Sequence, residues 1–274
     1  MATGYWALVL HAHLPFVRHP EDPTVMEEQW LYEAITGTYL PLLQTFEGLV
    51  ADHVPFRVTV SLSAPLITML TDDLLKQRYA EHLDKLIELT EKEIERTKPE
   101  PHYQRLAHMY HDRFQSLRHT WRCHDGNLVL AFKRLQDAGR VEVITSTATH
   151  AFFPAMDRNW SNIRAQVHVA ADLFEKHFGH RPRGMWLGEC GYVPRGRWPK
   201  WRSKRSAATC TCARMLDQLR SMSGKKACVA VEVITSTRPA SCRRLNASTR
   251  LPSWQRQVWR SDWKRSWYMC ASRW

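Results

Sequence analysis

Short apolar runs alternate with longer amphipathic stretches along the first two thirds of the chain. The apolar runs are four to seven residues long, and several are rich in β-branched side chains, which is typical of buried strands. The amphipathic stretches place apolar residues three or four positions apart, which is typical of helices with one buried face. The expected strands are residues 5–10, 56–62, 141–145 and 184–187. The expected helices are residues 27–50, 72–98, 103–138 and 161–178.

Residues at the ends of the expected helices support this division. Thr71 can cap the second helix, with Asp72 and Asp73 in its first turn. Gly139 and Gly179 can end the third and fourth helices. Strand and helix therefore alternate four times, with crossovers long enough to join parallel strands. The pattern predicts an α/β fold, either a (β/α) barrel or a doubly wound sheet, and in both the reactive side chains lie at the carboxyl ends of strands.

The charge of the chain is distributed unevenly. The 274 residues include 39 Lys and Arg and 27 Asp and Glu, for a formal net charge of +12. Residues 195–274 hold 19 of these basic side chains and only 3 of the acidic ones, so residues 1–194 are mildly acidic. The basic segment also has too little Leu, Ile, Val and Phe to fill a hydrophobic core. We therefore expect one domain at residues 1–194, followed by an aberrant, disordered basic tail at residues 195–274.

The composition changes abruptly at Pro194, and our hypothesis is that the tail is translated in a wrong reading frame. The heptapeptide at 141–147 recurs at 231–237, and we interpret the second copy as an accident of sequence and not as a structural repeat. Basic residues interleaved with Trp are also compatible with a polyanion-binding segment. No nucleic-acid-binding motif is visible, so we expect no specific nucleic-acid partner.

The sequence also bears on localisation and cofactors. The first residues lack the basic start and the long apolar run of a signal peptide. No apolar stretch approaches the roughly 20 residues that span a bilayer. Cys123 and Cys190 lack metal-ligand spacing, and Cys210 and Cys212 are too close together for an ordinary structural zinc pair. We expect a cytoplasmic protein with no cofactor and no membrane partner.

Three histidines and one carboxylate follow the expected strands. His11 and His13 follow the first strand, His150 the third and Glu189 the fourth, so all four side chains should converge on one face of the sheet. Two chemistries fit this set. Glu189 can serve in glycoside transfer with the histidines binding sugar hydroxyls, or all four residues can ligate a divalent metal that activates water. Composition and spacing alone leave both open.

Several motifs resemble glycoside hydrolase family 57, in particular its α-1,4-glucan branching enzymes. The similarity lies in five segments, in chain order and at plausible spacing. They are His11-Ala-His-Leu-Pro-Phe-Val17, Glu28-Gln-Trp-Leu-Tyr-Glu-Ala-Ile35, Tyr39-Leu-Pro-Leu42, Thr145-Ser-Thr-Ala-Thr-His-Ala151 and Trp186-Leu-Gly-Glu-Cys-Gly-Tyr-Val-Pro194. The one departure within a motif is Gly188, where the family usually has proline, and we expect it to be tolerated.

The resemblance implies a (β/α)7 barrel, a retaining double displacement and an α-glucan substrate, with no metal. It implies that Glu189 is the nucleophile, that a glucan hydroxyl releases the bound sugar as a new α-1,6 branch, and that several side chains bind substrate. The implied substrate-binding residues are His11, His13, Trp30, His150, Trp186 and Tyr192.

The resemblance ends at Pro194, and the motif that carries the family's general-acid Asp is not found in this chain. We therefore expect an incomplete barrel of the first four β/α units, with weak activity or none. Within the family the alternatives are a 4-α-glucanotransferase and an α-amylase. Outside it they are a metal-dependent hydrolase and a polyanion-binding fragment without enzymatic activity. The oligomeric state is not predicted.

Overall fold

A computed structural model describes residues 4–156, 159–191 and 226–234 of the chain. Its strands are β1 (Gly4–Ala12), β2 (Val58–Leu62), β3 (Val141–Ser146), β4 (Met185–Trp186) and β5 (Lys226–Ile234). They form one sheet in the order β4-β3-β2-β1-β5. All pairings are parallel, so the carboxyl ends of the strands share one edge of the sheet. The four strands expected from the sequence are all present.

The first four strands lie side by side in chain order. His11 pairs with Ser61, Leu62 with Thr145, and Ser146 with Trp186, so the strand ends are nearly level. A doubly wound sheet reverses its strand order at a switch point. From β1 to β4 there is no reversal, and helices cross over between successive strands. This is the winding of a TIM-like barrel, of which the described residues form an incomplete part.

One strand lies where the sequence analysis placed no element. Residues 226–234 form β5, which pairs with the free edge of β1 over its whole length. The first four residues of the second heptapeptide copy, 231–234, belong to this strand. A strand parallel to β1 on the side away from β2 takes the position at which a barrel closes.

The first crossover is one long helical unit with a widened turn in its middle. It consists of α1 (Met26–Ala34), the π-helical turn η1 (Ile35–Tyr39) and α2 (Leu40–Ala51). The sequence predicted one helix over residues 27–50, a range that includes Gly37 and Pro41. Pro41 has no N–H to donate, and the π-helical turn lets the chain continue through this position without a break.

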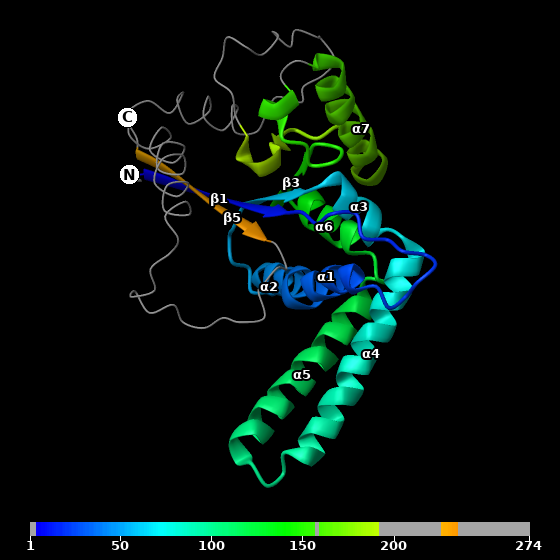
Figure 1. The fold of residues 1–274 in the computed structure, drawn as a ribbon. Helices are drawn as coiled ribbons and strands as arrows, with labels where there is room; N and C mark the ends of the chain where they lie inside the picture. The colour runs from blue at the N-terminus through cyan, green and yellow to red at the C-terminus, as the bar shows by residue number, and fades with distance from the viewer. Residues whose placement is uncertain (1–3, 157–158, 192–225, 235–274) are drawn as a thin grey trace, which may run out of the picture.

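The second crossover contains α3 (Ala64–Leu70), α4 (Asp73–Arg96), α5 (Pro101–Cys123) and α6 (Leu128–Asp137). Helices α4 and α5 form a hairpin that projects away from the sheet (Figure 1). The cap of α4 is Asp72, whose carboxylate accepts from the Leu75 N–H, so the prediction of Thr71 as the cap is wrong. The predicted helix 103–138 is also divided, because Asp125 and Gly126 adopt left-handed backbone conformations between α5 and α6.

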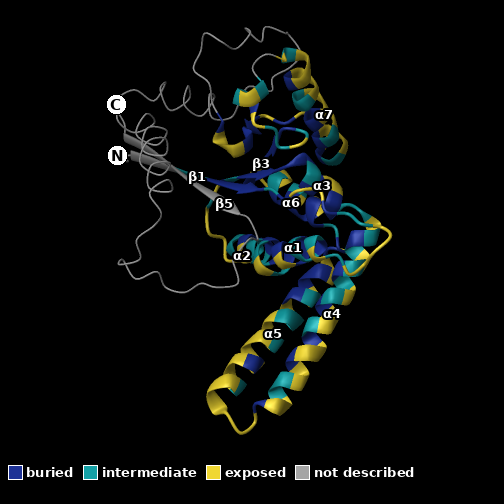
Figure 2. Ribbon diagram, viewed as in Figure 1, coloured by how far each residue is buried: buried dark blue, intermediate teal, exposed yellow. Residues whose placement is uncertain are grey.

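The last described crossover is α7 (Trp160–Phe178), which ends at Gly179 as the sequence predicted. Gly179 has φ +80°, a conformation that favours glycine. The largest fully buried side chains include Tyr39, Tyr79, Phe132 and Phe174. Buried positions follow the sheet and the inner helix faces, whereas the far end of the α4–α5 hairpin is exposed (Figure 2). In the described part of the chain, no helix has both the length and the apolar character needed to cross a membrane.

Candidate active site

Three imidazole rings meet at the carboxyl edge of the sheet. His11 lies in β1, His13 follows it directly, and His150 lies in the loop after β3. The Nε2 atoms of His11 and His150 are 2.9 Å apart. The rings of His13 and His150 stack with their centroids 3.7 Å apart. The structure therefore brings together the three histidines that the sequence places at the ends of the first and third expected strands.

Hydroxyl groups from the next strand hold two of these rings. The Nδ1 atom of His11 lies 3.0 Å from the Ser61 Oγ, and the Nδ1 atom of His13 lies 2.9 Å from the Ser63 Oγ. Both serines are fully buried. They are two residues apart around the end of β2, so they face the same way as the two histidines on the neighbouring strand. Neither serine was among the residues that the sequence predicted to form the site.

The surroundings keep the histidines neutral. Burial lowers the pKa of His11 to about 3 and that of His13 to about 4, and the neighbouring imidazoles add to both shifts. Burial also lowers the pKa of His150, against the opposing effect of the Glu189 carboxylate. At pH 7 each ring therefore has one N–H donor and one acceptor nitrogen.

Glu189 is presented to solvent on a left-handed turn. It lies in the 3-10 turn η3 (Gly188–Cys190), where Glu189 has φ 50° and Cys190 φ 55°. The Glu189 side chain is 75% exposed, and its Oε1 lies 3.8 Å from the His150 Nδ1. Non-glycine residues in this region are strained, and such residues cluster at functional sites. The turn thus points a solvated carboxylate at the histidine cluster.

Gly188 allows this turn to approach the His150 loop closely. A Cβ at Gly188 would lie 2.5 Å from the Ala151 carbonyl oxygen and 2.6 Å from that of His150. Any side chain at this position, including the proline usual in the resembling motif, would push the two loops apart in this conformation. The sequence analysis expected glycine at this position to be tolerated. The observed geometry goes further and requires glycine there.

The other predicted substrate-binding residues have different positions. Trp186 is buried at the end of β4 and stacks on His11 with ring centroids 5.6 Å apart, so it packs against the His11 ring of the cluster. Trp30 lies on α1 and packs, partly buried, against the main hydrophobic core. Tyr192 lies outside the described residues. The roles of all three side chains at a sugar site stay predictions.

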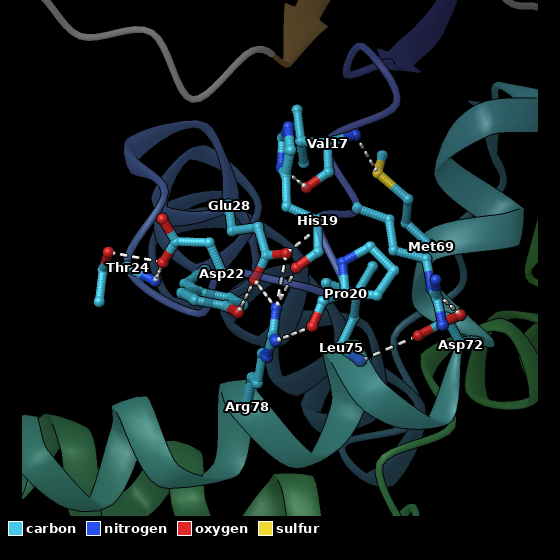
Figure 3. A network of polar contacts seen from close by, with 12 residues as sticks. Val17, His19, Pro20, Asp22, Thr24, Glu28, Met69, Asp72, Leu75 and Arg78 are labelled. Atoms are coloured by element: carbon cyan, nitrogen blue, oxygen red, sulfur yellow. Dashed lines mark hydrogen bonds and ion pairs between the residues drawn. The ribbon is translucent and has the colours of Figure 1, made fainter.

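A second polar network holds the loop that leaves β1 next to the histidine cluster (Figure 3). The Glu28 carboxylate has no exposure to solvent and accepts from the His19 N–H at 2.8 Å and from the Arg78 Nη1 at 2.8 Å. Arg78 also donates to the carbonyl oxygens of His19 and Pro20. Side chains from α1 and α4 therefore bind the backbone of the loop that continues from His13. No local sequence pattern indicates this pairing, because Glu28 and Arg78 are far apart in the chain.

The arrangement of these side chains also bears on the alternative of a metal site. His11 uses both ring nitrogens in hydrogen bonds to Ser61 and His150. Among the residues that the structure describes, no group of three or more His, Cys, Asp or Glu side chains is arranged to hold a metal ion. The observed geometry is instead a hydrogen-bonded imidazole cluster beside a carboxylate.

A parallel sheet whose first four strands lie in chain order, with polar side chains gathered at the carboxyl ends of its strands, defines a (β/α)-barrel type of protein. The sequence comparisons narrow this class. The family model of glycosyl hydrolase family 57 matches residues 7–234, which extends beyond Pro194 and includes most of the described chain. The chain belongs to glycosyl hydrolase family 57.

Individual relatives agree with this assignment. The chain is 38% identical over 197 residues to the 1,4-alpha-glucan branching enzyme TK1436 of Thermococcus kodakarensis. It superposes with a TM-score of 0.67 and 35% identity on the GH57-type branching enzyme of Pyrococcus horikoshii. It superposes with a TM-score of 0.68 and 43% identity on the alpha-amylase AmyC of Thermotoga maritima.

These matches cover most of this chain but a minor part of each relative. The match to TK1436 covers 71% of this chain and 28% of that enzyme. The matches to the Pyrococcus and Thermotoga structures cover 70% and 72% of this chain, and 36% and 37% of those chains. The chain thus spans about a third of the length of the relatives it matches.

Proposed function

We propose that this chain carries the nucleophile half of an α-1,4-glucan branching site. The observation that carries the proposal is Glu189, an exposed carboxylate on a strained turn that faces three neutral histidines at the strand ends. Family membership and the similarity to two branching enzymes support glucan transfer as the reaction. The proposed partner is an α-glucan, and the proposed compartment is the cytoplasm.

In the proposed first step, a Glu189 oxygen attacks the anomeric carbon of an α-1,4-linked glucose unit. The glycosidic oxygen leaves with a proton supplied by a general acid, and a glycosyl ester forms on Glu189. In the second step, the 6-hydroxyl of an acceptor glucan attacks the same carbon, loses its proton to the conjugate base and frees the carboxylate. His13 and His150 bind hydroxyls of the donor sugar, and Trp30, Trp186 and Tyr192 complete its surroundings.

The chain itself should turn over poorly. We expect no general acid among residues 195–274, and the loss of such a group typically costs about 10²–10⁴-fold in rate. A substrate whose leaving group needs no proton avoids this deficit. Maltosyl fluoride with the α configuration is such a substrate, because fluoride leaves without protonation.

The test is therefore covalent labelling of the full chain with α-maltosyl fluoride. We expect mass spectrometry to detect a maltosyl adduct, and peptide mapping to place it on Glu189. Glu189→Gln should form no adduct. Glu142→Gln makes the same change at an exposed carboxylate in β3 and should be labelled like the wild type. An adduct on another carboxylate, or none on the wild type, contradicts the proposed role, as does stoichiometric zinc in the purified chain.

Hydrolysis is the second candidate function, favoured by the similarity to an alpha-amylase at 43% identity. The fate of the labelled enzyme distinguishes the two. Transfer predicts that maltoheptaose accelerates loss of the label and yields an α-1,6-linked product. Hydrolysis predicts release of free maltose at a rate that maltoheptaose does not change.

A further inference from the structure

His11 links a buried serine to the histidine that faces Glu189. Its Nδ1 lies 3.0 Å from the Ser61 Oγ, and its Nε2 lies 2.9 Å from the His150 Nε2. A neutral imidazole has one N–H and one acceptor nitrogen. The two hydrogen bonds of His11 must therefore run in opposite senses, and the direction of one fixes the direction of the other.

Ser61 has a second partner that sets this direction. Its hydroxyl lies 3.4 Å from the Thr145 carbonyl oxygen, which only accepts hydrogen bonds. Ser61 has a single proton and is fully buried. If that proton goes to Thr145, the Ser61 oxygen accepts from the His11 Nδ1–H. His11 then accepts at its Nε2 from His150, which must carry its proton on Nε2.

The reverse direction makes fewer hydrogen bonds. Ser61 would then donate to His11, His11 would donate to His150, and the His150 Nδ1–H would point toward Glu189. That last separation is 3.8 Å, beyond hydrogen-bonding distance, and the contact to Thr145 would be lost. In either direction one of the two rings carries its proton on Nδ1 and the other on Nε2. The intrinsic preference of imidazole for one tautomer therefore favours neither direction. When the donors run from His150 through His11 and Ser61 to Thr145, all three hydrogen bonds form. The reverse direction forms only two of them.

We propose that Ser61 is a positioning residue that fixes His11 as its Nδ1–H tautomer and, through it, His150 as its Nε2–H tautomer. The Nδ1 of His150 then presents a lone pair to Glu189. His150 becomes a donor to that carboxylate only when it takes up a proton. Among the described residues, the groups that face His150 are the rings of His11 and His13 and the Glu189 carboxylate. Only the consequence for a nucleophilic Glu189 rests on the proposed function, since the tautomers follow from the buried contacts alone.

The test is the ¹⁵N NMR spectrum of the histidine rings in the full chain. Protonated and unprotonated ring nitrogens give separate resonances, and their couplings to the carbon-bound protons tell Nδ1 from Nε2. The spectra are recorded at about pH 7.5, above the ordinary histidine pKa of about 6.5. The signals of the two rings are those missing from His11→Asn and His150→Asn. We expect the proton of His11 on Nδ1 and that of His150 on Nε2; the opposite pair of tautomers overturns the proposal.

A serine substitution tests the direction of control. In Ser61→Ala the His11 Nδ1–H loses its acceptor. His11 should then move its proton to Nε2 and donate to His150, whose own proton should move to Nδ1. A merely structural role for Ser61 does not move a proton on His150, which Ser61 does not touch. Wild-type tautomers in Ser61→Ala overturn the proposal.

Ser63→Ala is the matched control, because Ser63 makes the corresponding contact to His13 at 2.9 Å. It should leave the tautomers of His11 and His150 unchanged, and a switch of both rings in this variant also overturns the proposal. The measurement uses no sugar. Unexpected tautomers would therefore contradict this proposal and leave the proposed function standing. Failure to label Glu189 would contradict only the proposed function.

Discussion

The guanidinium of Arg78 lies 2.8 Å from the carboxylate of Glu28, a side chain that is completely buried (Figure 3). The carboxylate also accepts from the Tyr32 hydroxyl at 2.8 Å, so both of its oxygens are satisfied. This pair joins α1 to α4 and holds the loop that continues from His13. A buried pair of this kind is costly to break on one side, because the remaining charge stays out of water.

Arg78→Met should lower the free energy of unfolding by about 3–5 kcal/mol, because it leaves the Glu28 carboxylate buried without a cation. The loss should be smaller when Glu28→Gln is added, since no charge then remains. Urea unfolding followed by circular dichroism measures both. Lys92→Met breaks the exposed Lys92–Glu88 pair on α4 and should leave the unfolding midpoint unchanged. If Arg78→Met and Lys92→Met lowered the free energy of unfolding equally, the role given to Arg78 would be contradicted.

Acidification should destabilise the chain through the histidine cluster. The pKa of His11 is lowered to about 3 and that of His13 to about 4, so both rings stay neutral in the folded chain at pH 5. The unfolded chain binds protons at these rings below its ordinary histidine pKa of about 6.5. The unfolded state therefore holds more protons between about pH 6.5 and pH 4, and stability must fall as the pH is lowered through this window.

The free energy of unfolding, measured in urea at a series of pH values from 7 to 5, checks this prediction. Each proton that only the unfolded chain binds contributes a slope of up to about 1.4 kcal/mol per pH unit. His11→Asn should flatten the dependence, because it removes one of these proton sites. A stability that stays constant or rises on acidification would show that the cluster is not buried in its neutral form.

Gly188→Ala should be destabilising although alanine is small. Its Cβ would meet two carbonyl oxygens of the His150 loop at 2.5 and 2.6 Å, and forcing atoms into a filled space typically costs about 1–3 kcal/mol. Gly48→Ala is the matched control: it lies in α2 with nothing within 4 Å of the added atom. That change should stabilise the helix by about 0.5–1 kcal/mol. Thermal unfolding of both variants shows whether the two signs are opposite.

The sequence predicted the strands and the residues at their ends because both depend on local patterns. Apolar runs specify β1 to β3, and parallel pairing then brings His11, His150 and Glu189 to one edge of the sheet. The remaining features depend on contacts between distant segments. The pairing of Glu28 with Arg78 and the bond from His11 to Ser61 each span 50 residues.

Backbone conformation was the other limit on what the sequence could predict. The left-handed turn at Glu189 lies where two loops approach closely, and no local residue pattern encodes it. The break within 103–138 did have a local signal, because Asp125-Gly126-Asn127 is a turn-forming sequence and Asn127 caps α6, but the helical spacing on both sides outweighed it. Strand β5 was missed because the basic composition around it outweighed a short apolar run.

Tyr39 provides a last prediction, in which removal of a polar atom should stabilise the fold. Its side chain is 1% exposed in the π-helical turn, and its hydroxyl has no hydrogen-bond partner within the described residues. A buried hydroxyl without a partner typically costs about 1–3 kcal/mol. Tyr39→Phe should therefore raise the free energy of unfolding, by about 1 kcal/mol.

Tyr79→Phe is the matched comparison, because Tyr79 is equally buried but its hydroxyl lies 3.1 Å from that of Thr36. Loss of this hydrogen bond should lower the free energy of unfolding by about 0.5–1.5 kcal/mol. Urea titrations of the two variants, side by side, separate the loss of a hydroxyl from the loss of a hydrogen bond. Destabilisation of similar size in both would mean that the Tyr39 hydroxyl has a partner in the folded chain.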